Sequence, residues 1–389
     1  MSQGPPADLK LQRTSRDPGT VPGLLEDWLA GALPAGAEPR VTLHSGIDAN
    51  GMSSETLVFD ATWTEDGEAR TGQYVARVAP SPDEFPVFQD YALQDQYDAM
   101  RIVGERTDVP VPTVGLFEPT GEVLGTPFFL MDRIEGVVPP DVPPYNWGDN
   151  WLADATPEDQ RALQDNTVRA IAGLHAIQDA GDAFSFLDRA GHAGATPLAR
   201  NLAWVRSWYE WSIPDLGPSP IAERTLAWLE ANLPDTSAAD TVLCWGDSRI
   251  GNVLYRDFAP AGVLDWEMAA IGPREMDVSW MVFAHMVFES ITEVFDFPGM
   301  PHFMREEDVK ATYAELTGVE LGDLTWYHLY NAVQWCVVFM RTGARQAHFG
   351  EIELPDHVDA LFHHAPLLTR LLDDAEQRGS EATDRKVGA

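Results

Sequence analysis

The residues best suited to chemistry in this chain lie on two short segments, Cys244–Asn252 and Val263–Glu267. Asp247 is followed five positions later by Asn252, and Asp265 comes thirteen positions after that. A carboxylate can orient a hydroxyl and take its proton, while a carboxamide oxygen and a second carboxylate can hold Mg2+ against the phosphates of a nucleotide. The spacing therefore predicts a phosphoryl-transfer site, with Asp247 as the catalytic residue and Asn252 and Asp265 as metal ligands.

Short buried strands are expected to position these three side chains. The apolar runs that predict them are 241–245, 253–255 and 262–264. Taken singly, each polar residue also has a plain structural interpretation, because Gly-Asp is a common turn dipeptide and both Asn252 and Asp265 could cap a strand. The three residues together at this spacing favour catalysis over those readings.

The two segments resemble the catalytic and metal-binding loops of the aminoglycoside phosphotransferase and choline kinase family, over roughly residues 40–350 and most strongly over 242–280. That family has His-Gly-Asp, four residues, Asn, and then a strand ending in Ile/Leu-Asp-Trp/Phe. The pattern also fits the branch found fused to, or encoded beside, acyl-CoA dehydrogenases. The residues that fit this branch are Arg249, Gly251, Asp265, Trp266 and Glu267.

The resemblance implies an α+β, protein-kinase-like two-lobed fold, with a small antiparallel-sheet N-lobe and a mostly helical C-lobe. It implies a small-molecule kinase that uses ATP or GTP with Mg2+ and passes the γ-phosphate to an alcohol group. An amino- or hydroxyl-rich acceptor, such as an aminoglycoside, is typical of the family. Antibiotic inactivation does not follow, because family members act on many alcohols.

One residue departs from the family pattern. Trp245 stands where the family has histidine, and an indole offers one donor and no acceptor. The resemblance implies that Trp245 braces the loop by packing, that Asp277 ties the loop's backbone, and that Arg249 supports the site. Glu267 either joins the site or forms a structural ion pair.

Residues expected to bind the nucleotide come from the first third of the chain. Arg77 stands where the fold usually has a lysine that contacts the α- and β-phosphates, and arginine keeps that charge. The alternative is a surface arginine on an edge strand. The usual glutamate partner is replaced by a neutral residue, Gln96, which would hold Arg77 more weakly.

Two further segments complete the expected nucleotide site. Gly51, Ser53 and Ser54 fall in the loop with which the family covers the phosphates, where a glycine permits close approach and hydroxyls meet phosphate oxygens. A plain hairpin turn is the alternative. Met131 and Arg133 resemble the hinge whose backbone contacts adenine.

The predicted organisation is a mobile tail, two lobes and a second mobile tail. Their boundaries are 1–22, 23–131 for the nucleotide-binding N-lobe, 132–374 for the C-lobe with the acceptor pocket, and 375–389. In the N-lobe, strands are expected at 41–47, 57–63, 73–78, 122–124 and 127–131, with a helix at 91–105. In the C-lobe, helices are expected at 158–178, 200–212, 219–232, 276–290, 305–317 and 324–346.

Bulk composition excludes several classes of protein. With 389 residues, 44% of them hydrophobic, the chain can build a large core. A net charge of −35 argues against nucleic-acid partners and anionic membranes, both of which need a basic face. Two separate cysteines and the lack of an apolar N-terminal segment favour a reducing cytoplasm.

The acceptor is predicted to be a small hydroxylated molecule. Protein kinases carry a long activation segment after the metal-binding aspartate, whereas here Asp277 follows Asp265 by only twelve positions. The tryptophans expected either to line the acceptor pocket or to pack the core are Trp204, Trp208, Trp211, Trp326 and Trp335. Two alternatives remain: a nucleotide-binding pseudoenzyme with little turnover, and a hydrolase that uses Asp247 with a second carboxylate.

Overall fold

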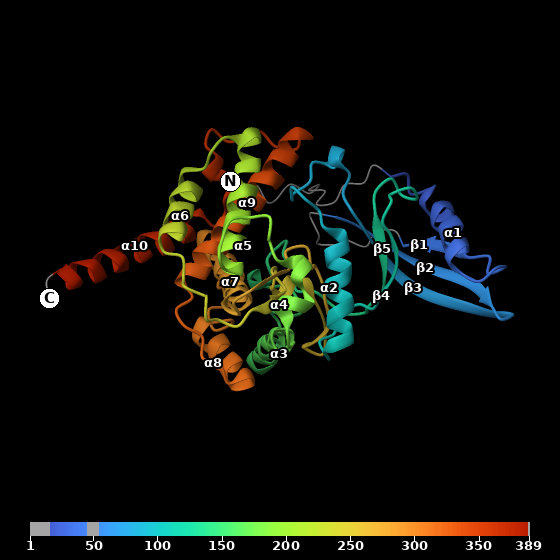
Figure 1. Ribbon diagram of the computed structural model, residues 1–389, viewed down its shortest axis with the longest axis horizontal. Helices are drawn as coiled ribbons and strands as arrows, with labels where there is room; N and C mark the ends of the chain where they lie inside the picture. The colour runs from blue at the N-terminus through green and yellow to red at the C-terminus, as the bar shows by residue number, and fades with distance from the viewer. Residues whose placement is uncertain (1–15, 45–53, 388–389) are drawn as a thin grey trace. The chain divides into compact units, whose positions relative to one another are not determined.

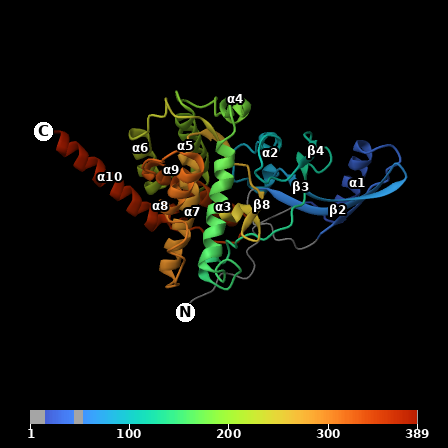
Figure 2. The same cartoon turned by 90° about the horizontal axis from the view of Figure 1, so that it is seen from below.

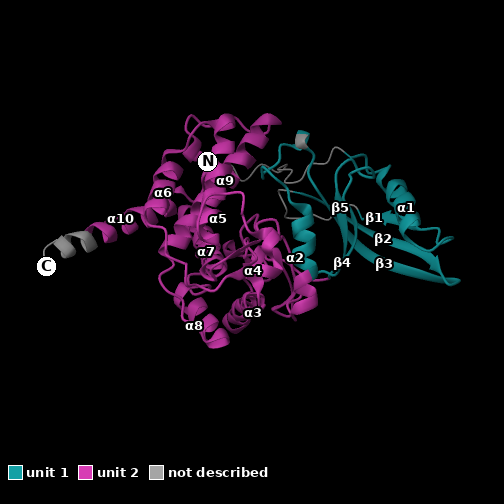
Figure 3. Cartoon of the chain, in the orientation of Figure 1, with its two compact units in different colours: residues 1–101, 112–134 teal, residues 102–111, 135–389 magenta. Residues whose placement is uncertain are grey.

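The computed structural model describes residues 16–44 and 54–387 and divides the chain into two compact units (Figure 3). Unit 1 comprises residues 1–101 and 112–134, and unit 2 comprises residues 102–111 and 135–389. The segment 102–111, which the sequence analysis placed in the N-lobe, joins unit 2 because its backbone pairs there. The amide of Val263 donates to the carbonyl of Pro110 at 2.7 Å.

Unit 1 is built on a five-stranded antiparallel sheet in the order β1-β2-β3-β5-β4 (Figure 1). Its strands are β1 (Arg40–Leu43), β2 (Glu55–Glu65), β3 (Glu68–Val78), β4 (Val114–Glu118) and β5 (Phe128–Asp132). The long β2–β3 hairpin turns at Asp66 and Gly67, both with positive φ. Asp-Gly is a preferred pair for such a two-residue turn, because both residues tolerate that backbone conformation.

Two helices belong wholly or partly to unit 1: α1 (Val21–Ala32) and α2 (Leu93–Arg106), which the unit boundary crosses. α1 buries Val21, Leu25 and Leu29 against the sheet, at the four-residue spacing of one helix face. Its Trp28 meets Phe128 of β5 edge to face, with ring centroids 4.7 Å apart.

Two of the sequence predictions for unit 1 need correction. The strand expected at 122–124 is instead a turn, with positive φ at Gly121 and Gly125, and the strand lies earlier, at β4. Leu124 is buried in the core although it lies in that turn. α1 begins at Val21, inside the segment predicted as a tail, and residues 1–15 lie outside the described part of the chain.

Unit 2 is mostly helical, and its helices can be followed in Figures 1 and 2. They are α3 (Pro157–His175), α4 (Ala180–Ala183), α5 (Pro197–Leu216), α6 (Pro220–Ala231), α7 (Glu275–Val294), α8 (Glu306–Thr317), α9 (Thr325–His348) and α10 (Ala365–Val387). α9 packs against α5, α6, α7 and α10 and is buried along most of its length. α10 extends through 375–387, which composition predicted as a tail; Ala375 is buried, and Arg224 of α6 pairs with Glu376.

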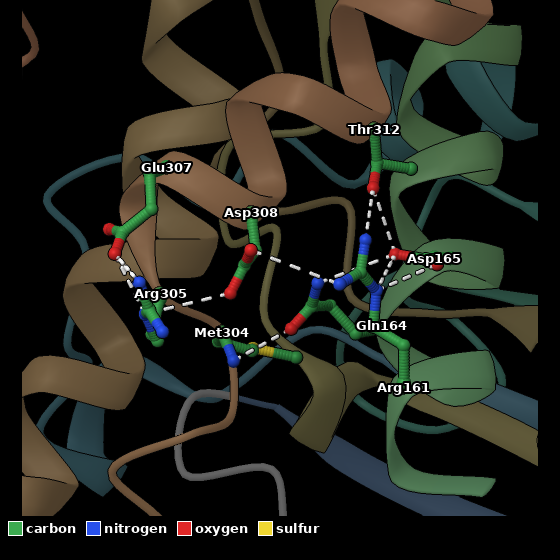
Figure 4. Close-up of polar contacts among 8 residues, drawn as sticks. All are labelled: Arg161, Gln164, Asp165, Met304, Arg305, Glu307, Asp308 and Thr312. Carbon is green, nitrogen blue, oxygen red and sulfur yellow. Dashed lines mark hydrogen bonds and ion pairs between the residues drawn. The ribbon is translucent and has the colours of Figure 1, made fainter. Parts of the chain in front are cut away.

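α3 is joined to α8 by polar contacts (Figure 4). Arg161 and Asp165, one turn apart on α3, form an ion pair at 2.8 Å, and both contact the hydroxyl of Thr312 on α8. Gln164 accepts a hydrogen bond from the amide of Met304 at 2.7 Å, just before α8. These contacts fix α3, which carries a histidine that reaches the site described below.

Two small antiparallel strand pairs sit among the helices and carry the sequence motif. β6 (Val242–Cys244) pairs with β9 (Ala270–Gly272), and β7 (Val253–Arg256) pairs with β8 (Ala259–Val263). The turn between β6 and β7 ends in the short 3-10 helix η4 (Ile250–Asn252). All three strands expected from the apolar runs near the motif are therefore present. In the described part of the chain, no helix is both long and apolar enough to span a bilayer.

Candidate active site

Asp247, Asn252 and Asp265 lie close together within unit 2. The amide nitrogen of the Asn252 side chain donates to the main-chain carbonyl of Asp247 at 3.0 Å. The backbone of Asn252 in turn accepts from Leu264, at 2.9 Å. The next residue, Asp265, has φ of +60°, a conformation that non-glycine residues rarely adopt and that recurs at functional sites. Folding thus brings the two loops of the motif side by side.

The carboxylate of Asp247 is largely enclosed, with 16% of its side chain exposed. The indole of Trp280, on α7, donates to it at 2.6 Å, and the guanidinium of Arg249 lies 3.2 Å away. Burial raises the pKa of Asp247 above its usual value, and the neighbouring charge of Asp265 raises it further, while Arg249 and the hydrogen bond from Trp280 oppose the shift. Asp247 and Asp265 are therefore near enough to repel each other.

Asp277, at the start of α7, fixes the backbone of the loop that carries Asp247. Its two carboxylate oxygens accept from the amides of Trp245 and Gly246, at 2.8 and 2.9 Å, and its carbonyl accepts from the hydroxyl of Ser248 at 2.8 Å. The side chain is fully buried. The geometry matches the backbone-tying role that the resemblance implied.

Behind Asp277 lie His175 and Cys244, and the potential ligand atoms of all three are within 4.8 Å of one another. His175 and Asp277 form a hydrogen-bonded support, while the thiol of Cys244 donates to the carbonyl of Pro273 at 3.5 Å. His175 bridges Asp277 at 3.1 Å and the hydroxyl of Tyr313 at 2.8 Å, and Asp277 already accepts two backbone amides. Burial raises the pKa of the Cys244 thiol well above its usual value, which disfavours the thiolate that a metal needs.

Trp245 braces the loop by hydrogen bonding as well as by packing. The side chain is 1% exposed, and its indole nitrogen donates to the carbonyls of Leu264 at 2.8 Å and Asp265 at 3.2 Å. The single donor of the indole thus reaches the backbone of the proposed metal-binding segment. Trp266, beside it, is buried and donates to the carbonyl of Val263. The departure from histidine leaves the two loops connected.

Arg249 links Asp247 to Asp141, a residue of the Pro-rich loop before α3, and forms an ion pair with each. Gly251 makes room for this pair. A Cβ on Gly251 would lie 2.4 Å from Nη1 of Arg249 and 2.8 Å from Oδ1 of Asp141. Glu267 lies two residues beyond Asp265 and is partly exposed.

The residues expected to bind nucleotide lie in unit 1. Arg77 is 9% exposed on β3, between β2 and β5, so it is neither on the surface nor on an edge strand. Gln96 is 4% exposed on α2. Ser54 is buried, and its hydroxyl makes no hydrogen bond to any described residue. Gly51 and Ser53 fall outside the described residues.

The expected hinge lies at the end of β5. Met131 pairs with Val75 of β3 and Val114 of β4. The amide of Arg133 donates to the carbonyl of Gln73 at 3.0 Å. The sequence analysis expected the backbone of Arg133 to contact adenine. The amide of Arg133 instead donates its hydrogen bond within unit 1.

Two residues that contact the site were missed in the sequence analysis. Trp280 follows Asp277 by three positions on α7, and residues at that spacing share a helix face, so the sequence held a signal for it. Asp141 lies 108 residues before Arg249, in an irregular loop, and no periodicity or motif points to it.

A model of the Phosphotransferase enzyme family matches residues 57–296, which is more than half of the chain. The chain belongs to this family, and the resemblance stated from its motif is confirmed. It is a phosphotransferase by family.

Curated relatives match part of the chain. It is 28% identical over 225 residues to the probable acyl-CoA dehydrogenase IBR3 of Arabidopsis thaliana, and 25% identical over 239 residues to acyl-CoA dehydrogenase family member 10 of Mus musculus. The matches cover 55% and 61% of this chain but only 26% and 20% of those relatives. The chain therefore spans about a quarter or less of their length, in line with the branch that its motif resembles.

Solved structures agree on the fold. A putative aminoglycoside phosphotransferase from Ralstonia eutropha JMP134 has a TM-score of 0.63 at 19% identity, over 91% of this chain and 98% of that one. A macrolide 2'-phosphotransferase type I has a TM-score of 0.52 at 16% identity, over 88% and 99%. The chain thus has the protein-kinase-like two-lobed α+β fold that the sequence analysis predicted.

Replacing Gly251 with alanine tests the space that it leaves for the ion pair. The atoms that the new Cβ would approach are the ends of flexible side chains, which can shift. We therefore expect the variant to fold, with a free energy of unfolding lower by about 1–3 kcal/mol. The displaced Arg249 should lower the rate of phosphate transfer at least tenfold. Urea unfolding and turnover assays measure the two effects.

The control is Gly322→Ala, because a Cβ there meets nothing within 4 Å. We expect that variant to behave as the wild type. Equal turnover in both glycine variants would contradict the role given to Gly251.

Proposed function

We propose that the protein transfers the γ-phosphate of ATP to a hydroxyl group of a small molecule, with Mg2+ held by Asn252 and Asp265. The observation that carries this proposal is the convergence of Asp247, Asn252 and Asp265 in one partly enclosed part of unit 2. A carboxylate for the acceptor and oxygen ligands for the cation are the parts that phosphoryl transfer requires.

The residues present suit a hard divalent cation. The amide nitrogen of Asn252 is held by the carbonyl of Asp247, which leaves its side-chain oxygen for a metal. Among the described residues, none donates a hydrogen bond to that oxygen. The proximity of Asp247 to Asp265 places negative charge where a cation would relieve repulsion. Bound Mg2+ would neutralise the charge that develops on the phosphates.

Asp247 is proposed to orient the acceptor hydroxyl and to take its proton. Trp280 and Arg249 contact its carboxylate from two sides and so restrict its orientation. An ionised carboxylate with a raised pKa is a better proton acceptor than one with an ordinary pKa.

The chain favours a small acceptor over a protein. α7 begins at Glu275, ten residues after Asp265, and strand β9 occupies part of that interval. This leaves no room for the long segment on which protein kinases bind a peptide. We therefore propose an alcohol-bearing metabolite-sized acceptor.

For the nucleotide, the proposal assigns Arg77 to the phosphates, with Ser54 and the loop containing Gly51 and Ser53 beside them. The position of Arg77 on β3, between β2 and β5, supports this, because the resemblance places the cation that contacts the phosphates on this strand. The same residues would accept GTP, since they contact phosphate and not the base.

The alternative of a pseudoenzyme rested on Trp245, Arg77 and Gln96. The indole of Trp245 donates to the carbonyls of Leu264 and Asp265. Tryptophan in place of the family's histidine therefore still holds the two loops together. Tight nucleotide binding without turnover over a broad panel of alcohols would favour the pseudoenzyme. Activity that needs neither nucleotide nor Mg2+ would favour the hydrolase.

Substitution of the acidic residues tests the proposal directly. We expect Asp247→Asn and Asp265→Ala each to lower Mg2+-dependent ATP turnover by at least a hundredfold while circular dichroism stays unchanged, because each removes a group that the transfer step needs. The control is Asp257→Asn, in the exposed turn between β7 and β8. Turnover that survives both site substitutions would refute the assignment.

The pH dependence tests the role of Asp247. Its ionised form accepts the proton, so the rate should fall as pH drops through its raised pKa, above the usual range of an aspartate. The indole of Trp280 stabilises the ionised form, and Trp280→Phe should therefore raise this pKa and move the acidic limb of kcat to higher pH.

The matched control is Trp335→Phe, because Trp335 packs 6.5 Å from Trp280, centroid to centroid, without a hydrogen bond to Asp247. An acidic limb that stays in place in Trp280→Phe would show that Asp247 is not the titrating base.

A further inference from the structure

Arg249 lies between two carboxylates and contacts them unequally. Its Nη1 donates to Asp141 in the shorter of the two ion pairs, whereas Nε alone faces Asp247, 3.2 Å from Oδ1 and 3.3 Å from Oδ2. Nη2 donates to none of the described residues. An arginine binds a carboxylate most strongly through two parallel N–H groups, and Asp247 receives one. The guanidinium is therefore held mainly by Asp141.

The two oxygens of the Asp247 carboxylate differ in their contacts. Trp280 donates to Oδ1 at 2.6 Å, so this oxygen is already engaged. Oδ2 meets Nε of Arg249 at 3.3 Å, which is long for an N–H···O hydrogen bond. Oδ2 is therefore the oxygen better able to accept a hydrogen bond from an acceptor hydroxyl. A second N–H group from Arg249 would occupy that oxygen.

Asp141 lies on a loop that is fixed at both ends within unit 2. Before it, Val137 and Tyr255 of β7 exchange two backbone hydrogen bonds, at 2.9 and 2.8 Å. After it, the hydroxyl of Tyr145 lies 2.7 Å from Nδ1 of His285 on α7. A carboxylate on a short span between two such anchors keeps its place. It can therefore hold a guanidinium that a second carboxylate also attracts.

The side chain of Asp141 acts on the site through Arg249. Its Oδ2 accepts from that guanidinium, while Oδ1 is buried and makes no hydrogen bond to any described residue. Oδ1 faces Gly251, since a Cβ there would lie 2.8 Å from it. An enclosed carboxylate oxygen without a partner is unfavourable for folding, so the hydrogen-bonding of Asp141 contributes to the fold only through Arg249.

We propose that Asp141 is a positioning residue, which holds Arg249 back from Asp247 and so keeps Oδ2 of that base open to the acceptor hydroxyl. Without the charge of Asp141, the attraction of Asp247 for the guanidinium is no longer opposed. The guanidinium then turns and adds Nη2 to the contact that Nε already makes, which pairs both oxygens of the base with arginine. This inference rests on the proposed phosphotransferase function and adds a residue to its acceptor step.

Asp141→Asn tests the restraint, because asparagine keeps the shape of the side chain and removes its charge. The assay is Mg2+-dependent ATP hydrolysis, in which water takes the place of the alcohol. We expect kcat to fall at least tenfold while KM for ATP changes less than twofold, because the blocked group faces the acceptor and not the nucleotide. The control is Asp188→Asn, since Asp188 pairs with Arg200 at 2.8 Å and is comparably enclosed. It should keep the wild-type rate.

The double variant Asp141→Asn/Arg249→Met separates this role from simple support of the loop. Methionine is close to arginine in length but has no N–H group, so it cannot cover Oδ2 of Asp247. We expect the double variant to hydrolyse ATP at least threefold faster than Asp141→Asn alone. If Asp141 only supported the loop, removal of its partner as well would restore nothing.

A crystal structure of Asp141→Asn gives a readout that does not depend on activity. We expect Arg249 to present both Nε and Nη2 to Asp247. An unmoved guanidinium, a wild-type rate in Asp141→Asn, or a double variant no faster than the single one would each overturn the inference. A wild-type protein without ATP turnover would instead refute the phosphotransferase assignment, and the position of Arg249 in the crystal would still decide whether Asp141 restrains it.

Discussion

The structure depends on holding two carboxylates, those of Asp247 and Asp265, near each other in a partly buried place. Burial and their mutual repulsion both raise the pKa of Asp247, and the guanidinium of Arg249 opposes part of that shift. The fold supplies the restraint through backbone contacts. Asp277 fixes the loop of Asp247, and the indole of Trp245 joins that loop to the carbonyl of Asp265. The proposed Mg2+ would relieve this repulsion.

Much of the fold could be predicted because hydrophobic patterning is local. The three short strands around the motif are continuous apolar runs, and each appears in the structure. The predicted strand at 122–124 failed because its two apolar residues, buried Leu124 and half-buried Val123, lie in a turn that Gly121 and Gly125 allow. α1 was missed although Val21, Leu25 and Leu29 repeat at helical spacing, since a polar segment precedes it.

The candidate site was predictable where a family motif fixes the spacing. Asp247, Asn252, Asp265 and Asp277 were all named from the motif, and the structure brings them together. Contacts between distant segments could not be read in the same way. Asp141 lies 108 residues before Arg249, and no repeating sequence pattern links residues that far apart. The bracing hydrogen bonds of Trp245 depend on where its ring points, which only coordinates reveal.

The most direct test of the central claim is a calorimetric titration of Mg2+ into the protein with a non-hydrolysable ATP analogue. The account predicts that the wild type binds Mg2+ and that Asp265→Asn weakens this binding at least tenfold, since a carboxylate oxygen is lost from the ligand set. Asp257→Asn, in an exposed turn, should bind as the wild type does. Equal Mg2+ affinity in the wild type and in Asp265→Asn would contradict the account.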